Sequence, residues 1–119
     1  MEIPKIFESE YRFCCILWSH EPVKSTELVR LCAKELGWSK ATTYTVIKRL
    51  TERGIVVSEN AVVRSLVSQD EVRTAQIEEL VDKSFDGSLP AFVAAFSRHK
   101  GLTPGEADAL RRLIDNWED

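Results

Sequence analysis

One short segment of the sequence brings many hydroxyl-bearing and cationic side chains together. Residues 37–56, GWSKATTYTVIKRLTERGIV, combine threonines with lysines and arginines at helical spacing. Within the helix predicted over residues 39–53, the stripe that can pack inward consists of Thr43, Val46, Ile47 and Leu50. Short hydroxyl and methyl groups on the other face can approach base edges in the major groove, and longer cations can reach guanine or phosphate. We therefore expect this segment to be a DNA-recognition helix.

The charge of the chain is unevenly distributed. The net charge of −3 by itself argues against a nucleic-acid partner. Residues 1–67, however, carry a balance of +2 and residues 68–119 a balance of −5, and residues 24–53 hold 7 cations against 3 anions. This asymmetry favours an anion-facing first part and a second part with another role. Phosphate contacts are expected from the cations of the predicted recognition helix, which are Lys40, Lys48, Arg49 and Arg53.

Caps and turns mark the elements that must position this segment. Helices are predicted at residues 9–19, capped by Ser9, and at residues 25–36, where Gly37 is expected to end the helix in a left-handed conformation. Ser39 is the expected N-cap of the third helix, so the second and third helices form a helix-turn-helix. After Gly54, the runs IVVS and AVVRSLV predict a hairpin that would be a wing. Three further helices are predicted at about residues 68–85, 88–99 and 103–117.

The predicted fold is thus mainly α with a small β-hairpin wing. It divides into a winged helix-turn-helix DNA-binding domain of residues 1–67 and a three-helix dimerisation domain of residues 68–119. Three short helices make a poor independent core, and a second copy of the chain would bury their apolar side chains. The residues expected at this dimer contact are Leu80, Phe85, Leu89, Phe92, Phe96, Leu110, Leu113 and Ile114.

The sequence argues against an enzyme and against a metal or cofactor site. It has no Ser/His/Asp grouping, carboxylate pair, phosphate loop or metal-ligand spacing. Cys14 and Cys15 lie in the apolar run FCCILW, which suits small core residues and would raise thiol pKa values. No run of about 20 apolar residues and no signal-peptide pattern occurs, so we expect a cytoplasmic protein without a membrane partner.

Several segments of the chain resemble the penicillinase-repressor family of dimeric bacterial winged-helix repressors. These are the segment from Glu10 to Ser19, WSKATTYTVIKRLTERGIV, SLVSQDEV and the spacing of the later helices. The resemblance covers nearly the whole chain. It implies a homodimer of interlocked protomers on a palindromic operator in double-stranded DNA, often that of β-lactamase or resistance genes and of their sensor protease. The implied DNA-binding positions are Lys40, Thr42, Thr43, Thr45, Lys48 and Arg49, to which Arg64 of the wing can add.

Three features depart from the family pattern. The wing is short, and its tip VSENAV offers an acid where a phosphate contact would be wanted. No cysteine follows Cys32, which excludes the C-terminal metal site of the copper-responsive branch. The Asn-Phe bond that is cut during induction of β-lactam-responsive members corresponds here to the bond between Ala95 and Phe96. A winged-helix module that binds protein and not DNA is the alternative interpretation of the fold.

Overall fold

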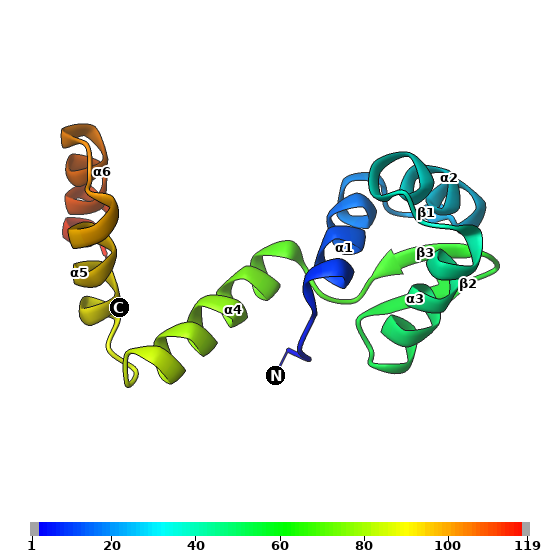
Figure 1. Cartoon of the computed structure of the whole chain (residues 1–119), viewed down its shortest axis with the longest axis horizontal. Coiled ribbons are helices and arrows are strands. Elements are labelled where there is room, and N and C mark those ends of the chain that lie inside the picture. The colour runs from blue at the N-terminus through cyan, green and yellow to red at the C-terminus, as the bar shows by residue number, and fades with distance from the viewer. Residues whose placement is uncertain (1–2, 118–119) are drawn as a thin grey trace. The chain divides into compact units, whose positions relative to one another are not determined.

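The computed structural model describes residues 3–117, which form helices and one small sheet (Figure 1). The chain divides into two compact units, with the boundary between Gln76 and Ile77. The predicted fold class, mainly helical with a small antiparallel sheet, is confirmed. In chain order the elements are α1 Glu8–His20, β1 Val23–Lys24, α2 Ser25–Leu36, α3 Lys40–Glu52, β2 Val56–Glu59, β3 Val62–Ser65, α4 Gln69–Ser84, α5 Leu89–Lys100 and α6 Pro104–Asp115.

The helix-turn-helix forms where the local signals placed it. Gly37 ends α2 with φ 70° and ψ 21°, a left-handed conformation that glycine adopts at little cost. Ser39 then caps α3, because its Oγ accepts a hydrogen bond from the backbone N–H of Thr42 at 3.1 Å. The two helices are therefore joined by a turn of three residues, 37–39.

The first helix begins differently from the prediction. Ser9 is not its cap, because α1 already starts at Glu8. The backbone N–H of Phe7 donates to Glu10 Oε1 at 3.0 Å, so the carboxylate of the third helical residue satisfies the N–H that precedes the helix. The start of α1 is thus set by an acid within its first turn.

The sheet contains one strand that the sequence did not predict. Its order is β1-β3-β2, with β3 paired antiparallel to both neighbours. The β2–β3 hairpin turns at Asn60 and Ala61, whose φ values of 53° and 62° are those of a tight hairpin turn. Strand β1 has only two residues, Val23 and Lys24, which is too short for an alternation of apolar and polar residues to show. Its pairing with β3 attaches the start of α2 to the wing.

One hydrophobic core lies within the first unit. Its fully buried side chains come from α1, α2, α3 and the sheet, and Phe13 stacks on Trp38 with ring centroids 6.2 Å apart. Val72 of α4 is 2% exposed and belongs to the same core. The first turns of α4 therefore complete the winged helix, although they lie beyond residue 67, where the domain boundary was predicted.

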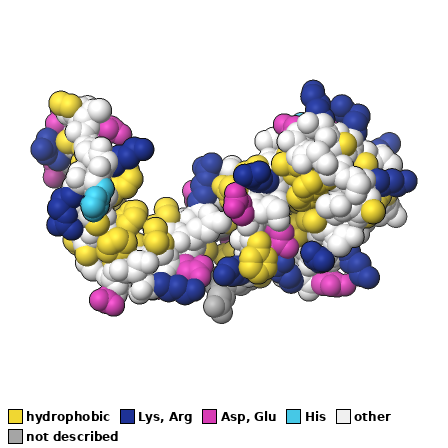
Figure 2. Space-filling view, viewed as in Figure 1, with side chains coloured by type: hydrophobic (Ala, Val, Ile, Leu, Met, Phe, Trp, Pro, Cys, Tyr) yellow, Lys and Arg dark blue, Asp and Glu magenta, His cyan; other side chains and the backbone are white. Residues whose placement is uncertain are grey.

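The second unit consists of the end of α4 with α5 and α6. Thr103 and Glu106 form the predicted capping box of α6, in which each side chain accepts the other residue's backbone N–H at 3.0–3.1 Å. Phe85 and Phe92 meet edge to face with centroids 5.6 Å apart. Val81 is buried, the other described side chains of this unit are partly or largely exposed, and hydrophobic side chains gather on its surface (Figure 2). Of the helices formed by residues 3–117, none is long and apolar enough to cross a membrane.

The three cysteines differ in their access to solvent, which predicts a labelling pattern. Burial raises the pKa of the Cys14 thiol to about 12, with a further increase from Cys15 and Glu10, and burial also raises the pKa of Cys32. At pH 8 only about one Cys14 in 10⁴ would then be a thiolate, the form that reacts. Cys15 is only partly buried. Iodoacetamide should therefore modify one thiol quickly in native protein and the other two only after unfolding, as mass spectrometry would show. In the Cys15→Ser variant the fast modification should disappear, and its persistence would contradict this assignment.

Candidate nucleic-acid interface

The outer face of α3 is exposed and rich in cations and hydroxyl groups. The inward stripe is confirmed, because Thr43, Val46, Ile47 and Leu50 are the buried residues of the helix. Within residues 3–117, the cations Lys40, Lys48 and Arg49 have no acidic partner. They remain available to an external anion. The predicted contact residues that the structure leaves exposed on this helix are Lys40, Thr42, Thr45, Lys48 and Arg49.

Thr43 does not belong to this exposed set. Its side chain is fully buried, and its hydroxyl donates to the backbone carbonyl of Ser39 at 3.2 Å. A residue that packs into the core and bonds the preceding turn cannot reach a base edge. The resemblance therefore assigned Thr43 to DNA wrongly, whereas the helical periodicity placed it inward correctly.

Arg53 also differs from the expectation that it contacts phosphate. Its Nη1 donates to Glu10 Oε2 at 2.7 Å, and its Nη2 donates to the carbonyl oxygen of Lys5. Its guanidinium also lies 5.6 Å from the centroid of the Phe7 ring. Two protein acceptors thus share this guanidinium, whose side chain is 31% exposed. The structure gives Arg53 partners within the protein, and a phosphate contact of this residue stays a prediction.

The wing carries one exposed cation. Arg64 lies on β3 opposite Val57 of β2 and is exposed. The hairpin tip, Glu59 to Val62, is attached to the start of α2, because the backbone N–H of Ser25 donates to the carbonyl of Ala61 at 2.8 Å. A short and anchored tip leaves Arg64 as the cation of the β2–β3 hairpin that can reach a phosphate.

Tyr44 is an exposed residue of the α3 face that was not among the predicted contacts. Tyr44 is 37% exposed, and its hydroxyl donates to Ser25 Oγ at 3.4 Å. This contact ties the first half of α3 to the start of α2. The outer position of Tyr44 was visible in the helical periodicity, but its partner, 19 residues earlier in the chain, was not.

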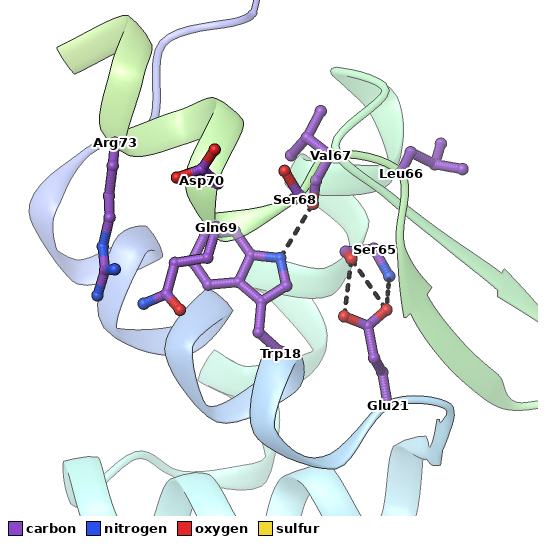
Figure 3. A pocket seen from close by; sticks show the side chains of 9 residues that line it. All are labelled: Trp18, Glu21, Ser65, Leu66, Val67, Ser68, Gln69, Asp70 and Arg73. Carbon is purple, nitrogen blue, oxygen red and sulfur yellow. Dashed lines mark hydrogen bonds between the residues drawn. The ribbon is translucent and has the colours of Figure 1, made fainter. Parts of the chain in front are cut away.

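A polar cluster attaches the segment after the wing to α1 (Figure 3). The indole N–H of Trp18 donates to the carbonyl of Val67 at 3.0 Å. The carboxylate of Glu21 accepts hydrogen bonds from the backbone N–H of Ser65 at 2.8 Å and from its hydroxyl at 2.8–2.9 Å. These bonds hold the end of β3 and the segment before α4 against the end of α1. The wing is therefore attached at its base by these bonds and at its tip by the bond from Ser25 to Ala61. Sequence reasoning missed this cluster, since its members are 44 and 49 residues apart.

The residues predicted to form a dimer contact lie on the second unit and are largely exposed. Phe85 and Phe92 are partly buried against each other. The other six range from 38% exposed for Leu110 to 72% for Ile114. Ala95 and Phe96, at the possible cleavage bond, lie inside α5, so a protease would have to open this helix before cutting it. Among residues 3–117, no group of three His, Cys, Asp or Glu side chains is arranged to hold a metal ion.

Comparison with known proteins points in the same direction as this geometry. Residues 6–116 match the family model described as penicillinase repressor. The chain is also similar to a penicillinase repressor of Bacillus licheniformis, with 20% identity over 122 residues. That alignment covers 99% of this chain and 95% of the relative.

Proposed function

Because the chain belongs to the penicillinase repressor family of DNA-binding transcriptional repressors, we propose that it acts as a homodimer on a palindromic operator, with α3 as the recognition helix. The observation that carries this proposal is the outer face of α3, where Lys40, Lys48 and Arg49 accompany exposed threonines and have no acidic partner among the described residues. Lysine and arginine can bind phosphate or guanine, and threonine offers a hydroxyl and a methyl group for base edges.

The proposed mechanism is steric. One α3 from each protomer enters the major groove, in successive grooves about 34 Å apart or a multiple of that distance. The bound dimer then blocks promoter DNA. Arg64 of the wing adds a contact to the phosphate backbone, and the operator controls genes of the antibiotic-resistance type.

The second unit supplies the dimer in this proposal. Its apolar side chains are exposed in the single chain, and Leu113 and Ile114 are 69% and 72% exposed. Exposed apolar surface of this kind is a common mark of a protein–protein contact. Release from the operator then follows when a sensor protease cuts α5 between Ala95 and Phe96, which would separate α6 from the rest of the dimer contact.

Selection of bound duplexes from a random-sequence pool would test DNA binding directly. The full-length protein should enrich a palindrome, and footprinting upstream of its own gene should protect a matching site. Enrichment of no sequence, with no footprint, would favour the alternative of a protein-binding module. A membrane protease with a sensor domain encoded next to this gene would support control by cleavage.

The salt dependence of binding should identify a phosphate contact on α3. Each phosphate that a protein neutralises contributes about −0.9 to the slope of log K against the logarithm of salt concentration. Lys48→Ala should therefore make this slope shallower by about one unit, measured by fluorescence anisotropy on the selected duplex. Lys100→Ala, at the end of α5, removes the same charge outside the winged helix and should leave the slope unchanged. An unchanged slope for Lys48→Ala would assign this lysine to base contact or to solvent.

A further inference from the structure

A partly buried polar clamp lies at the C-terminal end of α3. We define it as the side chains of Glu10 and Arg53 together with the backbone of Lys5 and Phe7. Arg53 donates to Glu10 at 2.7 Å and to the carbonyl of Lys5, and the N–H of Phe7 donates to the second oxygen of Glu10 at 3.0 Å. The clamp thus joins three segments, which are the residues before α1, the first turn of α1 and the end of α3.

This ion pair differs from the other ion pairs of residues 3–117. The side chain of Glu10 is 8% exposed and that of Arg53 is 31% exposed. The other pairs join residues three or four apart, and their side chains are 44–83% exposed. Exposed pairs within one helix contribute little to stability, whereas a buried pair cannot lose one partner without leaving an uncompensated charge. The ion pair of the clamp can therefore constrain how the end of α3 lies against the start of α1.

The clamp adds directional bonds to a helix that is packed mainly through apolar contacts. Val46, Ile47 and Leu50 hold α3 through apolar contacts, which are non-directional and allow small rotations of a helix. The guanidinium group is a planar fork whose bonds to two acceptors have a defined geometry. The hydroxyl of Tyr44 makes the corresponding polar contact in the first half of α3. Two polar contacts along one helix define its angle better than packing alone.

We infer that the clamp fixes the angle at which α3 presents its outer face to DNA, so that Glu10 and Arg53 are positioning residues for sequence-specific binding. This inference rests on the proposed function. It gives a role to an arginine at the end of the proposed recognition helix that is bound to a carboxylate of α1. Breaking the clamp should impair contacts to base edges, which require close placement, more than contacts to phosphate made by long and flexible lysines.

The experiment compares the full-length protein on two duplexes, one selected by the wild type and one unrelated duplex of equal length. The principal variant is the double substitution Glu10→Gln/Arg53→Gln, which breaks the clamp without changing the net charge. Its affinity for the selected duplex should fall by about tenfold, the value of about one base contact. Its affinity for the unrelated duplex and its salt slope should stay as in the wild type. Arg53→Lys, which keeps the charge and loses the fork, should lie between the double variant and the wild type.

Two controls separate positioning from stability. All affinities are measured well below the unfolding temperature of each variant, which circular dichroism establishes beforehand. Glu8→Gln/Arg12→Gln removes an exposed pair from α1 in the same charge-neutral way and should bind both duplexes as the wild type does. If the double variant does not fold, the comparison rests on Arg53→Lys, which keeps the pairing charge and should lose affinity on the selected duplex alone.

Each outcome separates the possible roles of the clamp. Unchanged affinity of the folded variants for the selected duplex would overturn the inference and leave the clamp a structural feature only. Weaker binding to both duplexes with a slope shallower by about 0.9 would also overturn it, because Arg53 would then neutralise a phosphate. A wild-type protein that does not distinguish the two duplexes would instead refute the proposed function.

Discussion

A chain that ends after Ala95 is expected to lose the dimer and to bind operator DNA about 10²–10⁴-fold more weakly than the full-length protein. Linking two DNA-binding units makes the second contact intramolecular, and this advantage disappears with the dimer. The truncation removes the second half of α5 and all of α6, including Phe96, Leu110, Leu113 and Ile114. Sedimentation velocity at micromolar concentration and anisotropy on the selected duplex would measure the two losses.

A point variant distinguishes loss of the dimer from loss of the fold. Leu113→Glu places a charge at an apolar side chain that is 69% exposed in the single chain, so it should weaken the dimer without disturbing a core. Arg112→Glu, at the neighbouring exposed position, is the matched control. If the truncated chain still forms a dimer and binds with full affinity, cleavage at Ala95-Phe96 is not the control point. The signal that controls release from DNA should then be sought in a small molecule or a redox change near Cys14, Cys15 and Cys32.

The substitution Phe13→Ala is expected to lower the free energy of unfolding by about 3–5 kcal/mol, as for other buried phenylalanines. Phe13 is fully buried and stacks on Trp38, which lies in the turn of the helix-turn-helix. Single domains are stable by only about 5–15 kcal/mol, so this change removes a large part of the total. Urea unfolding followed by circular dichroism would measure it, and operator binding should fail at the lower temperature where the variant unfolds.

Phe7→Ala is the matched control for this prediction. Phe7 is 56% exposed and contacts Lys5 and Arg53 through its ring face. Its removal should cost about 1 kcal/mol or less, since cation–π contacts at exposed sites are weak. Equal losses for the two variants would contradict the assignment of Phe13 to the core of the first unit.

The sequence by itself determined the helix boundaries that depend on neighbours a few residues away. Gly37 and Ser39 placed the turn and the start of α3, and the caps at Ser68 and Thr103 placed the starts of α4 and α6. The outer face of α3 followed from helical periodicity alone. All of these interactions close within about one helical turn, so the residue types and their spacing contain the information.

Only the tertiary structure decided which long-range partners the polar residues take. Arg53 was expected to meet phosphate, but it is bound to Glu10, 43 residues earlier, and Trp18 is bound to Val67, 49 residues later. Strand β1 exists because β3 lies beside it, not because its two residues favour a strand. Whether a cation faces solvent or a buried carboxylate depends on how the helices pack, and this cannot be predicted from a local pattern of residues.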